Sequence, residues 1–559
     1  MTNQTQKNTF DAIVVGSGIS GGWAAKELTQ GGLKTLLLER GRNIEHIIDY
    51  TTALKHPWQF KYRSHLSNQD LKERPIQSSH CDDTNKHFFV KDNEHPYVQI
   101  NPYKWIRGYQ VGGRSLTWGR QCYRFSDLDF EANKKDGHGV DWPIRYDDLA
   151  EWYDYVEDYV GISGSAESLA HLPDGVFLPP IPMNAIELHL QESVSKEYSD
   201  RVIINGRVAN LTVPKKGRGP CQYRNLCSRG CPFSGYFSSN SSTLLDAHKT
   251  GNLTLRANSI VKEVIYDAAQ KKAVGVVIID AITKEEINYY ATIIFLNAST
   301  IATTAILLNS VSPSFPNGLG NSSLQVGHNL MDHVVNEGTF GTYDGLTDKY
   351  YEGKSPGTIY IPRFQNLNRE TKNTDFIRGY GIQGKGEREH WQTKAFVGFG
   401  TSLKEQLETP GKWKISLGGR GETLPNYENK ITLDTENKDQ WGLPLVKVDF
   451  KYGSNELAMM EHMTKASEEI LSKAGFKNVG SYRTSPSPGS AVHEMGTARM
   501  GHDPKTSVLN NHNQMHDVKN VFITDGSCMT SSGSQNPSLT YMAMTARACQ
   551  FAIKHYFSN

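Results

Sequence analysis

The 559-residue sequence contains few cysteines, no long apolar run and no excess of either charge. Seven cysteines in a chain of this length do not form a disulfide framework. Lys and Arg total 60 and Asp and Glu total 59, a formal net charge of +1, so we expect no nucleic-acid-binding surface. No apolar run approaches the roughly 20 residues that a membrane-spanning helix needs, so we expect no membrane-spanning segment.

The opening of the chain predicts a βαβ unit. An apolar strand at 12–15 leads into a glycine-rich turn, a helix follows to about residue 28, and a second apolar strand lies at 35–38. The turn reads GSGISG, which is a G-x-G-x-x-G pattern placed between a strand and a helix. This placement predicts a dinucleotide-binding domain of the Rossmann type.

The glycines of this turn have separate physical roles. Gly16 allows the tight turn, Gly18 lets a pyrophosphate approach the backbone, and Gly21 lets the helix pack closely on the strand. The phosphates then face free N–H groups at the helix N-terminus. Glu39 ends the second strand, where a carboxylate accepts hydrogen bonds from the adenosine ribose. The pattern alone does not separate NAD from FAD.

Five further segments, together with this turn, resemble the glucose–methanol–choline (GMC) oxidoreductases, a family that holds FAD. They keep the family's order along the chain, which a chance match would not. The segments lie at 107–115 (RGYQVGGRS), 327–333 (GHNLMDH), 492–497 (VHEMGT), 525–526 (DG) and 536–540 (NPSLT).

The resemblance implies that FAD is bound without a covalent link. Some members attach FAD through a histidine four residues after the second glycine of the Gly112–Gly113 pair, and this chain has Thr117 at that position. The resemblance places FAD contacts, in addition to those of the first turn, at Gly112, Gly113, Ser115, Val261, Asp525, Gly526, Asn536, Ser538 and Thr540.

His493 and Asn536 occupy the positions of the family's catalytic pair. An alcohol that is oxidised loses a proton and a hydride, and histidine suits the proton because its ordinary pKa lies near neutrality. Asn536 would hydrogen-bond the hydroxyl as alkoxide character develops. One histidine among 19 is usually structural, but His493 and Asn536 each lie in a matching motif and in the family's order. We assign no chemistry to His328 or His333.

Three cysteines cluster at Cys221, Cys227 and Cys231, and proline follows the last of them. This spacing suits an iron–sulfur cluster, and three thiolates favour a [3Fe-4S] form. A four-iron form with a non-cysteine ligand, a zinc site and unliganded thiols stay as alternatives. The surrounding basic residues would guide an electron acceptor or belong to a solvated loop; they are Lys215, Lys216, Arg218, Arg224 and Arg229.

The expected fold class is α/β (α+β overall), with a discontinuous Rossmann-like FAD-binding domain and a substrate domain built on an antiparallel sheet. Strand-like stretches separated by polar loops between 340 and 450 predict that sheet. The expected ranges are 1–45, 100–125, 205–338 and 485–559 for the FAD domain, 126–204 and 339–484 for the substrate domain, 46–99 for an excursion near the site, and 215–235 for the cysteine loop.

A closer resemblance is to the bacterial sugar-dehydrogenase branch, and within it to D-glucoside 3-dehydrogenases. The cysteine cluster and the DWPI segment at 141–144 carry it. It implies a dehydrogenase that oxidises C3 of glucosides or disaccharides and passes electrons through the iron–sulfur cluster to a cytochrome c-type acceptor. A choline- or polyol-type alcohol dehydrogenase is the second enzyme hypothesis, and a non-catalytic flavin-fold assembly subunit is the hypothesis from another class.

The polar first nine residues carry neither the apolar core of a secretory signal nor a twin-arginine pair. We therefore expect a cytoplasmic protein on the basis of its own sequence. The resemblance also implies a second route, in which a small signal-bearing subunit carries the folded chain to the periplasm.

Overall fold

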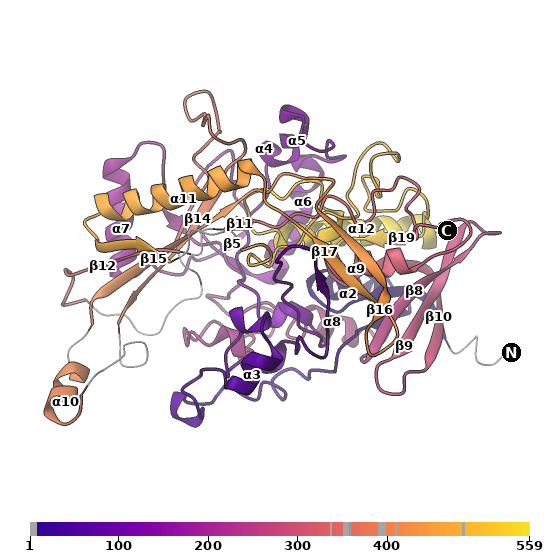
Figure 1. Ribbon diagram of the computed structural model, residues 1–559, viewed down its shortest axis with the longest axis horizontal. Helices are drawn as coiled ribbons and strands as arrows, with labels where there is room; N and C mark the ends of the chain where they lie inside the picture. Colours follow the sequence, from indigo (N-terminus) through magenta and orange to yellow (C-terminus); the bar gives the residue numbers. More distant parts are fainter. Residues whose placement is uncertain are drawn as a thin grey trace.

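The structure is a computed structural model that describes residues 8–335, 338–349, 357, 359–389, 398–408, 411–482 and 487–558. Within these residues, two seven-stranded sheets form the two halves of the molecule (Figure 1). The sheet that lies nearer the C-terminus is mostly parallel, and the other is antiparallel. The mixed α/β architecture confirms the predicted fold class.

The mostly parallel sheet has the order β7-β2-β1-β10-β9-β8, with β19 paired to β10. Alternate residues of β1 enter two different cores, because both faces of the sheet are covered. This double burial explains why β1 and β2 appear in the sequence as continuous apolar runs. The strands are β1 (Thr9–Val15), β2 (Thr35–Leu38), β7 (Leu253–Arg256), β8 (Ser259–Asp267), β9 (Lys272–Asp280), β10 (Glu286–Leu296) and β19 (Val521–Ile523).

Helices α2 and α12 pack against each other on one face of this sheet (Figure 1). Ala12 and Val14 of β1 contact this layer, which includes Ala24 and Leu28 of α2 and Ala548 of α12. The small side chains allow the helices to approach the sheet closely. The surrounding helices are α2 (Ile19–Gln30), α6 (Ala150–Val160), α8 (Thr243–Lys249), α9 (Thr300–Asn309) and α12 (Ser538–Phe557).

The antiparallel sheet has the order β18-β12-β15-β14-β13-β6, with β11 paired to β15. Residues of β15 alternate between buried and half-buried positions, the pattern of a sheet covered more fully on one face. Helix α11 covers that face, and Gly419 and Gly421 leave room there for Met463 and Met459. The elements are β6 (Ile204–Asn205), β11 (Val334–Val335), β12 (Thr339–Tyr343), β13 (Ile359–Ile361), β14 (Tyr380–Arg388), β15 (Trp413–Gly421), β18 (Lys477–Ser481), α7 (Ala185–Glu197) and α11 (Ser454–Lys473).

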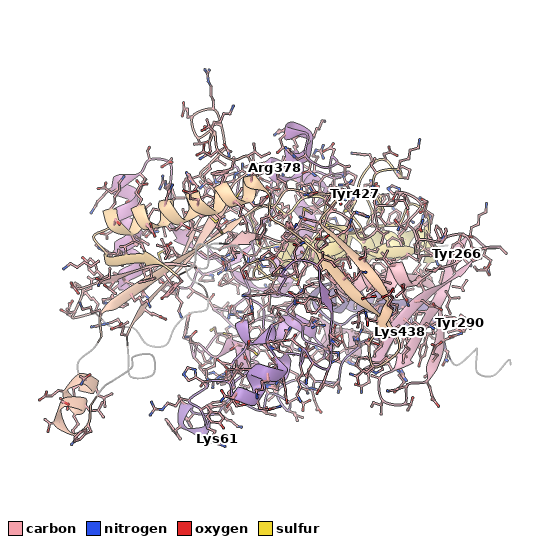
Figure 2. The ribbon with its side chains drawn as sticks, in the orientation of Figure 1. Lys61, Tyr266, Tyr290, Arg378, Tyr427 and Lys438 are labelled. Carbon is pink, nitrogen blue, oxygen red and sulfur yellow. The ribbon has the colours of Figure 1, made fainter. Side chains whose placement is uncertain are left out.

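Smaller elements connect the two halves. The hairpin β16–β17 pairs with β3, and β16 packs on α9. Arg378, which is labelled in Figure 2, makes a buried ion pair of 2.5 Å with Glu422 and also contacts Asp136 of α5. The remaining strands and helices are β3 (Val98–Gln99), β4 (Ile162–Ser163), β5 (Phe177–Leu178), β16 (Lys430–Lys438), β17 (Pro444–Asp449), α3 (Asn68–Glu73), α4 (Asp127–Phe130), α5 (Ala132–Asp136) and α10 (Thr401–Glu408).

Among the described residues, no helix combines the length and the apolar character that a membrane span requires. The two sheets have separate hydrophobic cores, one built around β1, β10 and α12 and the other around β14, β15 and α11. The division of the chain at the ranges given above stays a prediction.

Candidate functional site

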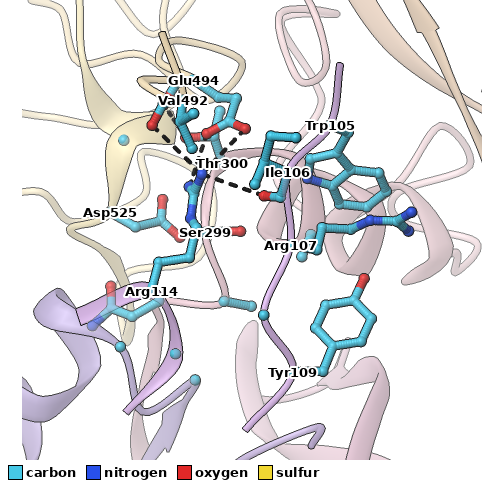
Figure 3. A pocket seen from close by; sticks show the side chains of 18 of the residues that line it. Trp105, Ile106, Arg107, Tyr109, Arg114, Ser299, Thr300, Val492, Glu494 and Asp525 are labelled. Carbon is cyan, nitrogen blue, oxygen red and sulfur yellow. Dashed lines mark hydrogen bonds and ion pairs between the residues drawn. The ribbon is translucent and has the colours of Figure 1, made fainter. Parts of the chain in front are cut away.

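A cavity of about 570 Å³ is lined from both sheets. The mostly parallel sheet contributes the ends of β1, β2 and β8, and the antiparallel sheet contributes β14 and β15. Loops before and after β19 and the hairpin β16–β17 complete the wall. Residues that lie hundreds of positions apart in the sequence therefore meet at one site, part of which is shown in Figure 3.

The first glycine turn lies at the wall of this cavity. Gly16 has φ +91°, and a Cβ on Gly21 would lie 1.7 Å from the carbonyl oxygen of Gly16. A Cβ on Gly18 would meet no atom within 4 Å, because this residue faces open space in the cavity. Helix α2 begins at Ile19 and carries no acidic residue in its first turn. The turn fits a pyrophosphate at the helix N-terminus.

Glu39 is buried at the end of β2 and lines the same cavity. Its carboxylate accepts hydrogen bonds from Ser17 N at 3.1 Å, Ser17 Oγ at 2.5 Å and Gly41 N at 3.0 Å. Burial raises the pKa of this carboxyl, and the hydrogen bonds from Ser17 and Gly41 oppose the rise. Glu39 therefore holds the glycine turn in place and also stands where a ribose would be bound.

The second glycine segment lies against the first. Gly112 N donates to Ser17 Oγ at 2.9 Å, and a Cβ on Gly113 would lie 3.3 Å from the Cα of Gly18. Gly112 has φ +91° and no room for a side chain beside Asn240. The two backbone segments therefore approach each other closely at the cavity wall, as glycine allows and as a bound dinucleotide requires.

Most of the predicted cofactor residues come together at the cavity. Three do not line it: Gly21 packs on the turn, Gly112 packs on Asn240, and Thr540 shares a 2.9 Å hydrogen bond with the buried Tyr153 hydroxyl behind the start of α12. The predicted residues that line the cavity are Gly16, Gly18, Glu39, Gly113, Ser115, Val261, His493, Asp525, Gly526, Asn536 and Ser538.

Asp525 is buried just after β19. Its carboxylate accepts hydrogen bonds from Thr303 Oγ1 at 2.6 Å and from Ser527 N at 3.0 Å, which join α9 to the turn before α12. Burial raises its pKa, and the hydrogen bonds from Ser527 and Thr303 oppose the rise. Asp525 thus positions the backbone of Gly526 at the cavity wall.

His493 and Asn536 meet at the cavity although 43 residues separate them. Asn536 Nδ2 lies 3.4 Å from His493 Nε2. Burial lowers the pKa of His493 well below its ordinary value, and electrostatic interaction with His333, Arg420 and Arg114 lowers it further. The imidazole is therefore neutral at working pH and is available as a base.

Residues without a predicted role complete this pair. Gln383 of β14 donates from Nε2 to Asn536 Oδ1 at 2.5 Å, so the amide nitrogen of Asn536 faces His493. His333 Nδ1 lies 2.9 Å from His493 Nδ1. Sequence reasoning missed both residues, although His333 ends one of the segments that resemble the family. No sequence signal pointed to Gln383, because the fold alone brings β14 to the cavity.

An ion pair fixes the segment that carries His493. Arg114 Nη2 donates to Glu494 Oε2 at 2.8 Å, and Arg114 also reaches the carbonyl oxygens of Ile106 and Val492 (Figure 3). Glu494 is almost fully buried. The second glycine segment therefore positions the chain on both sides of the histidine, a contact that the motif comparison did not suggest.

The three clustered cysteines lie in a loop outside the cavity wall. All three are half-buried free thiols, and among the described residues no group of three or more His, Cys, Asp or Glu side chains is placed to hold a metal ion. Cys221 Sγ accepts a hydrogen bond from Tyr223 N at 3.4 Å, and Cys231 Sγ accepts one from Gly235 N at 3.3 Å. The thiols as placed do not form a metal site, so the predicted cluster stays a proposal.

A glycine turn for a dinucleotide and a half-buried, neutral histidine beside an amide open onto one cavity. Together they define an oxidoreductase that binds a dinucleotide and acts on an alcohol. The chain belongs to the GMC oxidoreductase family, which it matches over residues 10–335 and 425–545. It is therefore an FAD-dependent oxidoreductase of CH–OH groups, as the motifs predicted.

Characterised relatives match nearly the whole chain. The sequence is 27% identical to 2-methyl-1,2-propanediol dehydrogenase of Mycolicibacterium austroafricanum, over 99% of this chain and 96% of the relative. It is 25% identical to the fructose dehydrogenase large subunit of Gluconobacter japonicus, over 98% of each. Gluconate 2-dehydrogenase flavoprotein of Pantoea cypripedii is 24% identical, over 100% of this chain and 95% of the relative. The fructose and gluconate dehydrogenases support the bacterial sugar-dehydrogenase branch.

Solved structures share the fold at lower identity. Pyridoxine 4-oxidase from Mesorbium loti aligns with a TM-score of 0.61 and 14% identity, over 98% of this chain and 99% of that one. A variant of formate oxidase from Aspergillus oryzae aligns with a TM-score of 0.60 and 16% identity, over the same shares. At these identities the likeness shows the fold alone.

Proposed function

We propose that the protein is a dehydrogenase that oxidises a sugar hydroxyl, with C3 of D-glucosides or disaccharides as the position attacked. The observation that carries the alcohol chemistry is the His493–Asn536 pair at the wall of the cavity that the glycine turns also line. The names of two relatives, a fructose dehydrogenase and a gluconate dehydrogenase, support a sugar-derived substrate. The C3 position rests on the resemblance to glucoside 3-dehydrogenases.

The residues of the site support removal of the hydroxyl proton by His493 Nε2. FAD, when bound along the glycine turns, supplies the acceptor for the hydride. Asn536 Nδ2 is placed to donate to the substrate oxygen beside that nitrogen, because Gln383 occupies the amide oxygen. The donor stabilises the developing alkoxide and does not compete for the proton.

A panel of substrates tests this proposal. Under anaerobic conditions, we expect methyl α-D-glucoside or a disaccharide to bleach the flavin, with a 3-keto sugar as the product by NMR. Oxidation at another carbon would contradict the C3 position and leave the sugar dehydrogenase in place. Bleaching by diols or choline alone would contradict the sugar substrate.

A polyol-type alcohol dehydrogenase is the second candidate function. One relative is named 2-methyl-1,2-propanediol dehydrogenase, and this name favours a small diol as the substrate. A cationic substrate such as choline is disfavoured, because Arg420 lines the cavity and its charge acts on His493. A non-catalytic assembly subunit is disfavoured because His493 and Asn536 are both present and brought together.

The FAD is proposed to be non-covalent. Thr117 lines the cavity at the position where some relatives carry a linking histidine, and its hydroxyl cannot form the histidyl bond. Acid precipitation should release all of the flavin into the supernatant. Yellow colour that stays in the protein pellet would contradict this proposal.

An iron–sulfur cluster at Cys221, Cys227 and Cys231, with a cytochrome c-type acceptor, completes the proposal for a dehydrogenase. The cysteine spacing and the two backbone N–H bonds to sulfur support it, and the loop would have to close around the metal. Just after the loop, Tyr236 donates to the carbonyl oxygen of Leu116 at 2.7 Å, and the chain neighbours of Leu116, Ser115 and Thr117, line the cavity. Four of the five basic residues hydrogen-bond to neighbouring residues and Lys216 lies over the Tyr159 ring, so charge alone is weak support for an acceptor surface.

Metal analysis of the purified protein tests the cluster. We expect iron and acid-labile sulfide, and we expect Cys227→Ser to remove both while sugar still bleaches the flavin. Zinc without iron would make the loop a structural metal site. If the analysis finds neither iron nor zinc, the three cysteines are free thiols and the basis for a cytochrome partner is removed. Co-purification with a small signal-bearing subunit would support export to the periplasm.

A further inference from the structure

Two histidines and a backbone carbonyl form a chain of hydrogen bonds behind the base. His333 Nε2 lies 3.3 Å from the carbonyl oxygen of Ser532, and His333 Nδ1 lies 2.9 Å from His493 Nδ1. The two rings are nearly perpendicular, at 85°. His333 is fully buried. Each of these hydrogen bonds has one donor and one acceptor to be assigned.

The carbonyl of Ser532 decides the assignment. A carbonyl oxygen only accepts hydrogen bonds, so His333 Nε2 must carry its proton. Burial lowers the pKa of His333 to about 4, so this ring is neutral and has only one N–H. Its Nδ1 is then a lone pair that must accept. The proton between the two rings therefore belongs to His493 Nδ1.

The same assignment leaves His493 Nε2 without a proton. His493 is neutral and carries its one N–H on Nδ1, so Nε2 presents a lone pair toward Asn536 Nδ2. In the other tautomer of His493, both Nδ1 atoms would carry a lone pair, and these lone pairs would face each other across 2.9 Å. We propose that His333 is a positioning residue that sets the tautomer of His493 and so presents its Nε2 as the base.

This inference rests on the proposed role of His493 and adds a residue to it. His333 does not act as a proton relay, because the chain ends at a carbonyl oxygen that cannot take up a proton. When His493 gains the substrate proton on Nε2, its Nδ1–H still donates to His333, so nothing in the chain has to rearrange. The arrangement serves both protonation states of the base.

The first test uses variants of His333. His333→Leu removes the acceptor and keeps an apolar side chain of moderate size in the core, whereas His333→Asn places an amide oxygen near the position of Nδ1. We expect His333→Leu to slow anaerobic flavin reduction by saturating methyl α-D-glucoside on the order of a hundredfold, the usual contribution of the general base that it disables. The dissociation constant of the sugar and the FAD content should change less than threefold or so, and His333→Asn should recover most of the rate.

A matched control is available in the same segment. His328 Nδ1 also bonds to a carbonyl oxygen, that of Tyr427 at 2.7 Å, but it lies outside the cavity and near the surface, where Tyr427 is labelled in Figure 2. In His328→Leu, the sugar should reduce the flavin at the wild-type rate. Wild-type rates in His333→Leu would overturn the proposal. Equal loss in His333→Leu and in well-folded His333→Asn would also overturn it, because the acceptor atom would then not matter.

A second measurement needs neither turnover nor folding of a variant. In the wild-type holoprotein labelled with ¹⁵N in the histidine rings, NMR correlations through the ring protons should show His493 protonated on Nδ1 and His333 on Nε2. A proton on Nε2 of His493 would overturn the inference. The proposed function is tested separately. It fails if methyl α-D-glucoside does not reduce the flavin of the wild type, or if the flavin of His493→Ala is reduced at the wild-type rate.

Discussion

His493 is held neutral in the site by its surroundings. Burial is the main cause of its lowered pKa, and nearby positive charge on Arg420 and Arg114 acts in the same direction. Because its pKa is lowered, His493 stays unprotonated when the pH falls to the ordinary pKa of histidine, so it stays available as a base there. The shift therefore extends the pH range of proton removal on the acid side.

His493→Ala tests this residue directly. We expect anaerobic flavin reduction to slow by about a hundredfold or more, the usual contribution of a general base. Sugar binding should survive better than turnover, because the remaining cavity wall is unchanged. Stopped-flow flavin bleaching measures both. A variant that reduces flavin at the wild-type rate would show that another group removes the proton.

Asp332 predicts a pH dependence of stability. It is fully buried, accepts a hydrogen bond from His493 N at 3.0 Å, and has its pKa raised to about 7 by burial and by Glu494. Between its unfolded pKa, about 4, and the folded value, the folded protein holds a proton that the unfolded chain has lost. The free energy of unfolding therefore falls as pH rises through this window, by about 1.4 kcal/mol for each pKa unit.

Asp332→Asn should remove this dependence, because the amide stays uncharged at every pH. We expect the variant to unfold at a higher temperature than wild type at pH 8 and at a similar temperature near pH 4, as followed by thermal denaturation. Parallel pH profiles for the two proteins would show that Asp332 does not carry the effect.

At the scale of elements, the first βαβ unit shows two different reasons for glycine. Gly21 lies where helix α2 meets the turn, and a Cβ there would collide with the oxygen of Gly16. Gly18 has φ −65° and free space around its missing Cβ. One glycine is required by the fold of the unit itself, and the other only by what the unit binds.

Gly18→Ala and Gly21→Ala should therefore behave differently. We expect Gly18→Ala to fold like wild-type apoprotein and to lose FAD affinity by on the order of tenfold or more, since its methyl group would enter the open space proposed for the pyrophosphate. Gly21→Ala should be poorly folded even without FAD. Circular dichroism of the apoproteins and titration of FAD fluorescence measure the two properties. Normal FAD binding by Gly18→Ala would place the pyrophosphate elsewhere.

At the scale of the molecule, the cavity joins both sheets. The glycine turns belong to the mostly parallel sheet, whereas Gln383 and Arg420 reach the cavity from β14 and β15 of the antiparallel sheet. The binding site for a cofactor in this cavity exists only when both halves are folded and packed together. Its binding energy should therefore appear as stability of the whole chain.

Removal of FAD should lower the unfolding temperature of the protein, and added FAD should restore it in a concentration-dependent way. A ligand at a hundred times its dissociation constant adds about 2.7 kcal/mol to the free energy of unfolding. Gly18→Ala serves as the control and should respond only at higher FAD concentrations. An unfolding temperature that does not depend on FAD would contradict binding across this cavity.

Much of the site was predictable because its parts are local. The glycine turn, Glu39 and the His493 and Asn536 motifs are each defined by a few neighbouring residues, and all of these segments reach the cavity. Thr540 shows the limit of a motif, since its side chain bonds to Tyr153 and does not face the cavity. The cysteine spacing shows another limit, because closeness in the sequence did not bring the thiols into a metal-binding group among the described residues.

The sequence by itself determined the α/β class, the βαβ opening and the family, because alternating burial, tight turns and backbone approach impose residue types over short distances. The tertiary structure decided which distant residues contact His493 and Asn536 and orient them. His333 and Gln383 reach the His493–Asn536 pair from other elements, and the Ser532 carbonyl that orders His333 is a backbone atom. No residue type marks a backbone carbonyl in a sequence, so only the folded chain reveals which nitrogen of His493 is free to act.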